Sequence, residues 1–240
     1  MMKTKVAGEI LRDPEKYAHH DRVFLNNPVV MQGMGLAPLV VLATSGKNAL
    51  MLAAAVALLL TPSRLLGCLL SRPFRLDEAP SREQLQKYLL PRCLVYCFST
   101  AVVYLGAYPV LNGLFGMDLL TLGIYLPMLT VEPLLIYRFG RVQESPRKAL
   151  SKGIRITLGY ALILLLVGCV RECLAAGTVF GVQAAWRAVL PMAGMPAGGF
   201  IVLGVLCALW RALVRKRKEY LKTEARNLAV AQYQKEAQEQ

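Results

Sequence analysis

An all-α membrane protein with six transmembrane helices is the fold class that the sequence predicts, and three observations predict it. Hydrophobic residues make up 55% of the 240 residues and charged residues only 18%, whereas soluble domains are about a quarter charged. The apolar residues are gathered into runs of about 20, the length that crosses a bilayer as a helix. Basic residues concentrate in alternate connections between these runs. The chain is therefore expected to cross a membrane several times.

Six apolar runs are the expected membrane segments. They cover residues 28–45, 48–70, 90–112, 118–137, 153–175 and 190–214. The second is expected to bend at Pro62, because proline removes a hydrogen bond inside a helix. The first 25 residues lack the apolar core of a cleavable signal peptide. The amino end is therefore expected to remain in the cytoplasm.

The positive charge of the chain indicates its orientation in the membrane. Lysine and arginine crowd residues 1–27, the connections after the second and fourth segments, and the stretch "RALVRKRK" that ends the sixth. Because basic loops stay in the cytoplasm, both termini are expected there. The net charge of +13 then reflects these flanks, and nucleic-acid binding is not expected.

Three regions follow from this pattern. Residues 1–27 form a cytoplasmic amino-terminal segment, 28–215 the membrane domain, and 216–240 a charged tail. The tail is rich in glutamine and lacks a strong apolar face, so a frayed helix or a disordered segment is expected.

The two halves of the membrane domain show a weak internal similarity. "LAPLVVL" in the first segment and "VEPLLIY" in the fourth both place a proline inside an apolar run. Since each half holds three segments, a repeat would be inverted, with interrupted helices meeting near the middle of the membrane. Chance similarity of short apolar strings is the alternative.

Several longer stretches resemble one known family. "NNPVVMQGMGLAPLVV", "IYLPMLTVEPLLIYR", "RKALSKGIRITLGYALILLLVGCVRECLAAGTVFG" and "MPAGGFIVLGVLCALWRAL" occur in the order found in Rnf/Nqr membrane subunits of the RnfE/NqrD type. The resemblance covers about residues 24–214. The residues of this chain that carry the family motifs are Asn27, Pro28, Gly35, Pro38, Arg171, Glu172 and Gly177.

The resemblance implies a fold and a function. Such proteins are six-helix subunits of complexes in a prokaryotic cytoplasmic membrane, and their first and fourth helices are interrupted. The complexes pass electrons between ferredoxin or a quinone and NAD, coupled to sodium or proton transport. An RnfA/NqrE-type partner of opposite topology would pack against this chain, and the two would share a [2Fe-2S] cluster held by two cysteines from each.

The expected cluster ligands are replaced in this chain. Ala37 stands at the ligand position of the first segment and Pro133 at that of the fourth. Neither side chain can supply the thiolate that iron–sulfur clusters need. The carboxylate that the family carries in the third helix is also replaced, by Val102 or Val103. No cofactor is therefore predicted from the residues of this chain.

Two cysteine pairs offer another interpretation. Cys93 and Cys97, and likewise Cys169 and Cys173, are four residues apart and share a helix face. They could form a relocated metal or redox site, but packing as small apolar side chains is favoured, because the ligand geometry would have to be rebuilt on other helices. His19 and His20 lie in the amino-terminal segment and are expected to be solvated.

Charged residues inside the apolar runs complete the candidates. Glu132 lies six residues before Arg138 and Arg64 eight before Arg72, so both are expected at similar depth on the cytoplasmic side. Because unpaired charges are costly there, we expect Arg64 and Glu132 to pair, structurally or along an ion path. Arg171 and Glu172 are adjacent on a helix, so they are expected to bind different groups and to serve packing.

Three functions remain open from the sequence. The first is a non-catalytic membrane subunit of an Rnf-type ion-translocating oxidoreductase complex. The second is a cluster-free scaffold paralogue in a related complex, which the missing ligands favour. The third is a component of a small-solute transporter, which an inverted repeat with buried charges permits. Copurifying flavoprotein subunits would separate the first two from the third.

Overall fold

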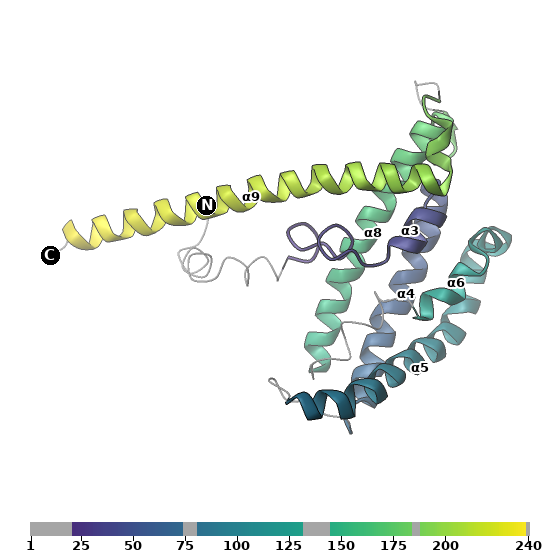
Figure 1. Ribbon diagram of the computed structural model, residues 1–240, viewed down its shortest axis with the longest axis horizontal. Helices are drawn as coiled ribbons and strands as arrows, with labels where there is room; N and C mark the ends of the chain where they lie inside the picture. Colours follow the sequence, from purple (N-terminus) through teal and green to yellow (C-terminus); the bar gives the residue numbers. More distant parts are fainter. Residues whose placement is uncertain (1–20, 74–80, 132–144, 184–187, 239–240) are drawn as a thin grey trace.

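A computed structural model describes residues 21–73, 81–131, 145–183 and 188–238. The pair of helices at its centre is α4 (Gly46–Leu70) and α8 (Pro146–Ala176), which lie side by side along most of their length (Figure 1). Both are long and apolar enough to cross a membrane. The predicted segments 48–70 and 153–175 lie inside them. Pro62 is accommodated within α4 without ending it.

Two further helices reach beyond this pair. α5 (Arg82–Phe115) packs against α4, and α9 (Pro196–Gln238) crosses the bundle near one end and extends far past it (Figure 1). Apolar windows in both are also long enough to span, but only 28% of each is buried, against 56% in α4 and 50% in α8. α5 and α9 therefore leave much apolar surface exposed.

The first predicted segment differs from the structure. Of residues 28–45, only α3 (Leu36–Leu42) is helical, and turns precede and follow it. The fourth segment is also broken, into the 3₁₀ helix η1 (Gly116–Leu122), α6 (Tyr125–Met128) and the 3₁₀ helix η2 (Leu129–Val131). Its remainder, residues 132–137, lies outside the described residues. Within the described residues, four helices rather than six are long enough to span.

The sixth segment also has different limits. A separate 3₁₀ helix, η3 (Pro191–Gly194), precedes α9, which begins at Pro196. α9 then continues without a break through residue 215 to Gln238, so the described tail is helical rather than disordered. Good helix formers such as alanine, glutamate and lysine dominate there, and neither glycine nor proline follows Gly204 in the helix.

A small hairpin follows α8. Strand β1 (Thr178–Val179) pairs antiparallel with β2 (Val182–Gln183). Its two turn residues, Phe180 and Gly181, both have positive φ, as in a type I′ turn. Gly177 has φ 69° and ends α8 in a left-handed cap. The hairpin is thereby placed over the end of α8.

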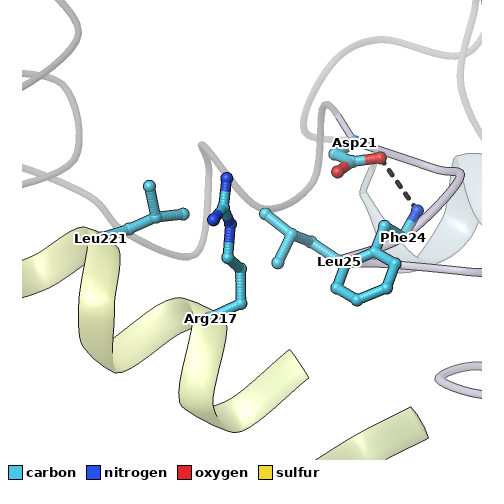
Figure 2. Close-up of a pocket in the computed structure, with 5 residues that line it drawn as sticks. All are labelled: Asp21, Phe24, Leu25, Arg217 and Leu221. Carbon is cyan, nitrogen blue, oxygen red and sulfur yellow. Dashed lines mark hydrogen bonds between the residues drawn. The ribbon is translucent and has the colours of Figure 1, made fainter. Parts of the chain in front are cut away.

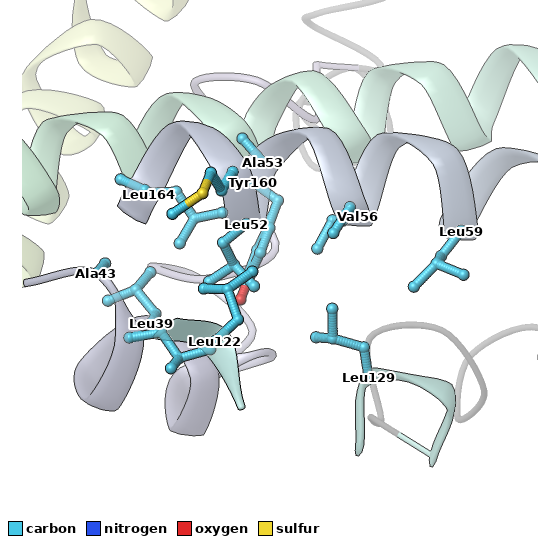
Figure 3. Close-up of a cluster of buried hydrophobic side chains, with 14 of the residues drawn as sticks. Leu39, Ala43, Leu52, Ala53, Val56, Leu59, Leu122, Leu129, Tyr160 and Leu164 are labelled. Atoms are coloured by element: carbon cyan, nitrogen blue, oxygen red, sulfur yellow. The ribbon is translucent and has the colours of Figure 1, made fainter. Parts of the chain in front are cut away.

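The core lies where α4 and α8 meet the two broken segments. Figure 3 shows Leu52 and Val56 of α4 on one side, with Leu39 of α3, Leu122 of η1 and Leu129 of η2 on the other. All five side chains are less than 5% exposed. Both interrupted segments therefore contribute buried side chains to the core at α4, although large side chains of the fourth segment such as Leu120 and Ile124 remain exposed.

Candidate functional site

One face of α8 holds the interrupted segment, residues 28–45. Gly159, Tyr160, Gly168, Arg171 and Glu172 all contact this segment or the residues that flank it. Tyr160 and Arg171, eleven residues apart, are nearly in line along the helix, and the other three lie to either side of this line. From the first to the last they extend over about 20 Å of helix. α8 therefore acts as a rigid support for backbone that makes few hydrogen bonds of its own.

Asn27 fixes the entry to this segment. Its side chain is fully buried, and its amide nitrogen donates to the carbonyls of Val23 at 2.9 Å and Gly159 at 2.8 Å. Its amide oxygen accepts from the backbone N–H of Val29 at 2.9 Å. Because Gly159 lacks a Cβ, the α8 backbone comes close enough for this bond. Asn27 thus ties the turn before α3 directly to α8.

Gly35 sets the start of α3. It has φ 70°, a left-handed conformation that favours glycine, and its carbonyl accepts from the Tyr160 hydroxyl at 2.9 Å. A Cβ on Gly35 would collide with the Tyr160 ring. The close approach and the backbone conformation both require glycine at this position.

We expect Gly35→Ala to destabilise the chain by about 2–4 kcal/mol, because the methyl group meets both the Tyr160 ring and an unfavourable φ. Thermal unfolding in detergent measures the loss. Tyr160→Phe, which removes only the hydroxyl, should cost about 1 kcal/mol. Gly106→Ala is the matched control, since a Cβ there meets nothing within 4 Å. Equal effects of Gly35→Ala and Gly106→Ala would show that the close contact is unimportant.

Arg171 binds the ends of two broken helical pieces. Its Nε and Nη2 donate to the carbonyls of Ala193, Gly194 and Met195 at 2.8–3.2 Å, and its Nη1 to those of Val40 and Ala43 at 2.6 and 3.1 Å. The side chain is fully buried. Its positive charge lies where the free carbonyls of α3 and η3 point, which favours a cation.

Glu172 binds backbone N–H groups, as Arg171 binds backbone carbonyls. Its carboxylate accepts from the backbone N–H of Gly46 at 2.7 Å, of Phe180 at 3.1 Å and of Gly181 at 2.7 Å. The Thr178 hydroxyl also donates to it, at 2.9 Å. The negative charge therefore sits at the first turn of α4, where a helix favours an anion, and it holds the hairpin turn in the same place.

The two adjacent side chains together fix the connection between α3 and α4. Arg171 holds the carbonyl of Ala43 at its start, and Glu172 holds the N–H of Gly46 at its end. Gly168 lies against the same turn, because a Cβ there would come within 2.8 Å of the Ser45 carbonyl. We call Asn27, Tyr160, Arg171 and Glu172 the anchor residues.

The position at which the family resemblance predicts a cluster ligand lies on the surface of this framework. Ala37 is exposed on α3, whereas the three residues that follow it are buried. Its methyl group cannot bind iron. Among the residues that the structure describes, no group of three or more His, Cys, Asp or Glu side chains could hold a metal ion. Pro133 lies outside the described residues. The residues present do not fit a cluster bound in the way that the family resemblance implies.

The predicted alternative ligands are separated between two helices. Cys93 and Cys97 lie on α5 and Cys169 and Cys173 on α8, and all four are free and half-buried. Cys97 packs against the hydrophobic core. His19 and His20 lie outside the described residues. Of the two valines at the carboxylate position, Val102 is 43% exposed on α5 and Val103 is half-buried.

Arg64 lies at the other end of α4 from the anchor residues. Its side chain is 1% exposed and packs beside Gly153 of α8. Glu132, its predicted partner, lies outside the described residues, so the pairing stays a prediction. Arg92 of α5 is also 1% exposed.

The pairing can be tested by reversing the charges. Arg64→Glu and Glu132→Arg alone should each cost about 3–5 kcal/mol, because each leaves a buried charge opposed, and the double variant should recover most of this loss. Thermal unfolding in detergent is the measurement. Lys47→Gln breaks the exposed ion pair of Lys47 with Asp118, whose atoms are 2.8 Å apart, and should have little effect. A double variant no better than the sum of its singles would contradict the pairing.

Sequence reasoning missed several residues of this framework. Tyr160 and Gly168 lie eleven and three residues before Arg171, so the helical period could have placed them on its face. Arg92 lies inside the predicted segment 90–112 and could have been found as an ionisable residue at membrane depth. The contact of Gly199 with the Arg171 guanidinium had no sequence signal.

The chain is similar to known membrane proteins over most of its length. The family model described as "Rnf-Nqr subunit, membrane protein" matches residues 17–207. A protein of Shewanella oneidensis, named as the E subunit of an ion-translocating oxidoreductase complex, is 31% identical over 213 residues, which are 81% of this chain and 85% of that protein. Proteins of the same name from Shewanella sp. strain ANA-3 and Shewanella putrefaciens are 32% and 30% identical, over 81% of this chain and 85% and 86% of theirs.

These matches agree with the structure. The matched range contains the interrupted segment, its support on α8 and the start of α9. Four helices of the described part are long and apolar enough to cross a membrane. The chain is a multi-pass membrane protein that belongs to the Rnf-Nqr family of membrane subunits.

Proposed function

We propose that this chain is an integral, non-catalytic membrane subunit of an Rnf-type ion-translocating oxidoreductase complex. The observation that carries the proposal is the match, over four fifths of the chain, to proteins whose name places them in such a complex. The complex would transfer electrons between ferredoxin and NAD and couple this to the transport of Na⁺ or H⁺. The role of this chain would be to build the membrane core, because the hydrogen bonds of its anchor residues run mainly to backbone atoms and hold the interrupted segment in place.

An RnfA/NqrE-type protein is the proposed partner in that core. Large apolar side chains are exposed along α5 and α9, among them Leu94, Phe98, Phe200 and Leu209, each at least 60% exposed. Such surfaces at membrane depth face lipid or another protein of the complex. Ala37 also faces away from the interior of the chain. A partner seated against α3 would cover this position.

The proposed setting is a prokaryotic cytoplasmic membrane with both termini in the cytoplasm. The alternation of basic connections with connections that hold few basic residues supports this orientation. The proposed arrangement retains six segments in two inverted repeats. The interruptions of residues 28–45 and 118–131, at corresponding places in the two halves, support it.

A cluster-free core subunit is the second candidate, and Ala37 favours it. Without thiolates at the two family positions, electrons would cross by groups on other subunits, or would not cross here. The partner sequence offers a direct check. Loss of its two corresponding cysteines would show that the shared site has been replaced as a whole.

Anaerobic purification of the tagged chain from its native membranes tests these proposals. We expect an RnfA/NqrE-type protein and flavin-bearing subunits to copurify, in amounts that an untagged strain does not give. Iron content and electron paramagnetic resonance of the membrane core then separate the two candidates. A [2Fe-2S] signal in the core would contradict the cluster-free candidate and make Cys93, Cys97, Cys169 and Cys173 the residues to mutate. Absence of flavoprotein partners would contradict the complex itself and favour a small-solute transporter.

A further inference from the structure

The charge pattern of α9 predicts a membrane boundary near Val214. Residues 196–214 are apolar except for Arg211, and the next four residues are all basic. Arg211 has a hydrogen-bond partner inside the protein. Its Nε and Nη2 both donate to the Val30 carbonyl, at 3.1 and 2.9 Å. Charged side chains avoid hydrocarbon, so α9 leaves the apolar part of the bilayer where the basic run begins.

Trp210 marks the same boundary. Its indole N–H donates to the Phe24 carbonyl at 3.1 Å, and the two rings pack with centroids 4.9 Å apart. Tryptophan is enriched where a membrane protein crosses the interface, because its ring is apolar and its N–H polar. The segment around Phe24 is therefore held against α9 at interface depth.

A pocket opens directly beyond this contact. It has a volume of about 450 Å³, within the range of small-molecule sites, and lies between residues 21–25 and α9. Figure 2 shows Arg217 and Leu221 of α9 on one side and Asp21, Phe24 and Leu25 on the other. Three of the five lining side chains are apolar. Among the described lining residues, the pocket therefore combines an apolar wall with one cation, Arg217, and one carboxylate, Asp21.

The charge of Arg217 is available to a ligand. Among the described residues, its guanidinium contacts the Tyr220 ring, at 5.8 Å from the ring centroid. Asp21 does not neutralise it by an ion pair in the described part of the chain, and its carboxylate accepts instead from the N–H groups of Val23 and Phe24 at 3.1 and 3.0 Å. The neighbouring basic residues of α9 are Arg215, Lys216, Lys218, Lys222 and Arg226, against only Glu219 and Glu224. An anion is therefore favoured here.

The expected position of the pocket relative to the bilayer indicates which kind of anion it binds. Arg217 and Leu221 lie three and seven residues beyond Val214, which is at most about 5 and 10 Å along the helix. The polar headgroup region of a bilayer is about 5–7 Å thick on each side. The anions that occupy this layer are phospholipid phosphates, and basic residues directly beyond a span attract them.

We propose that the pocket formed by residues 21–25 and α9 binds the headgroup of an anionic phospholipid. Arg217 contacts the phosphate, while Leu25 and the Phe24 ring, which pack beside Val214 and Trp210 on the membrane side of Arg217, contact the glycerol and the upper acyl chain. The bound lipid would fasten the amino-terminal segment to α9 where the two leave the bilayer. This site is independent of electron transfer and of the proposed complex, because it requires only that α9 meets the membrane surface.

The test measures lipid retained by the full-length chain, purified in mild detergent with whatever subunits it keeps. Phosphatidylglycerol or phosphatidylcholine is added to the delipidated protein, and bound lipid is counted by native mass spectrometry. We expect phosphatidylglycerol to be retained in preference to phosphatidylcholine, and Arg217→Gln to weaken its binding about fivefold. Arg217→Lys should retain most of the binding. Arg226→Gln, which removes the same charge about 13 Å further along α9, should leave it unchanged.

Four results would overturn the proposal. Equal retention of the two lipids would show that the headgroup charge is not recognised. Equal loss in Arg217→Gln and Arg226→Gln would show attraction by the whole basic helix rather than by this pocket. Displacement of the lipid by millimolar inorganic phosphate, with direct phosphate binding, would make the site one for a free anion. An acidic peptide found in its place would identify a protein partner instead. Size-exclusion chromatography of each variant establishes whether it is folded. If Arg217→Gln does not fold, the comparison of Arg217→Lys with the wild type still tests the proposal.

Discussion

Replacing Arg171 with methionine is expected to destabilise the chain by about 3–5 kcal/mol, or roughly 10 °C in its unfolding midpoint. Methionine preserves much of the side-chain volume but leaves the carbonyls of two broken helical ends without their donor. Each buried carbonyl left unpaired costs about 1–3 kcal/mol. The six free cysteines allow unfolding in detergent to be followed with a thiol-reactive dye.

Lysine should not rescue position 171. Its ammonium carries three donors on a single point, whereas the five carbonyls surround a planar guanidinium. Arg147→Met is the matched control, because Arg147 lies on the first turn of the same helix, far from these carbonyls. Wild-type stability of Arg171→Lys would show that charge alone is required and that the five hydrogen bonds of the guanidinium do not explain the role of this residue.

Replacing Glu172 with glutamine is expected to cost about 2–4 kcal/mol, since hydrogen bonds to a charged acceptor contribute more than neutral ones. The amide has the same shape but carries an NH₂ group in place of one oxygen. In one orientation this NH₂ faces the N–H of Gly181, and in the other the N–H groups of Gly46 and Phe180. At least one donor is therefore left opposed to another donor in either orientation.

The same unfolding measurement tests this prediction. Glu83→Gln, on the exposed first turn of α5, removes an equal charge and should leave the midpoint within about 2 °C of the wild type. Thr178→Val removes only the hydroxyl donor and should cost about 1 kcal/mol. If Glu172→Gln matched Glu83→Gln, the carboxylate could not be what holds the start of α4 and the hairpin.

The continuous membrane spans were predictable from the sequence. For the interrupted segments, the sequence predicted where a helix is broken but not which residues remain helical. Residues 48–70 and 153–175 fall within α4 and α8 because long unbroken apolar runs have one stable conformation in a membrane. Pro38 and Gly35 indicated a broken first segment. They could not indicate that only Leu36–Leu42 is helical, because that limit is set by hydrogen bonds from α8. The sequence left the tail past residue 215 as either a frayed helix or a disordered segment, because tail composition alone does not show that a helix already formed will extend.

The anchor residues show the same division. The sequence placed Arg171 and Glu172 at the end of a helix, and their adjacency implied that they bind different groups. The sequence could not identify those groups. The five hydrogen bonds of Arg171 and three of the four of Glu172 run to backbone atoms of distant or irregular segments, and the fourth of Glu172 runs to the Thr178 hydroxyl. Such partners have no signature in a single sequence. The replacement of a cluster ligand by Ala37 stays a prediction, because the ligand position comes from the family resemblance and the structure shows only that this residue is exposed.

The bonds between α8 and the interrupted segment also dictate an order of events during synthesis. They join residues 125 to 132 positions apart. At 5–20 residues per second, a ribosome needs on the order of 10 s to make the intervening chain. During that time the first segment has neither its Arg171 nor its Glu172, and its free carbonyls and N–H groups cannot remain in hydrocarbon unpaired. The first segment should therefore be the last part of this region to settle in the bilayer, waiting in the translocon or at the membrane surface until α8 has been inserted beside it.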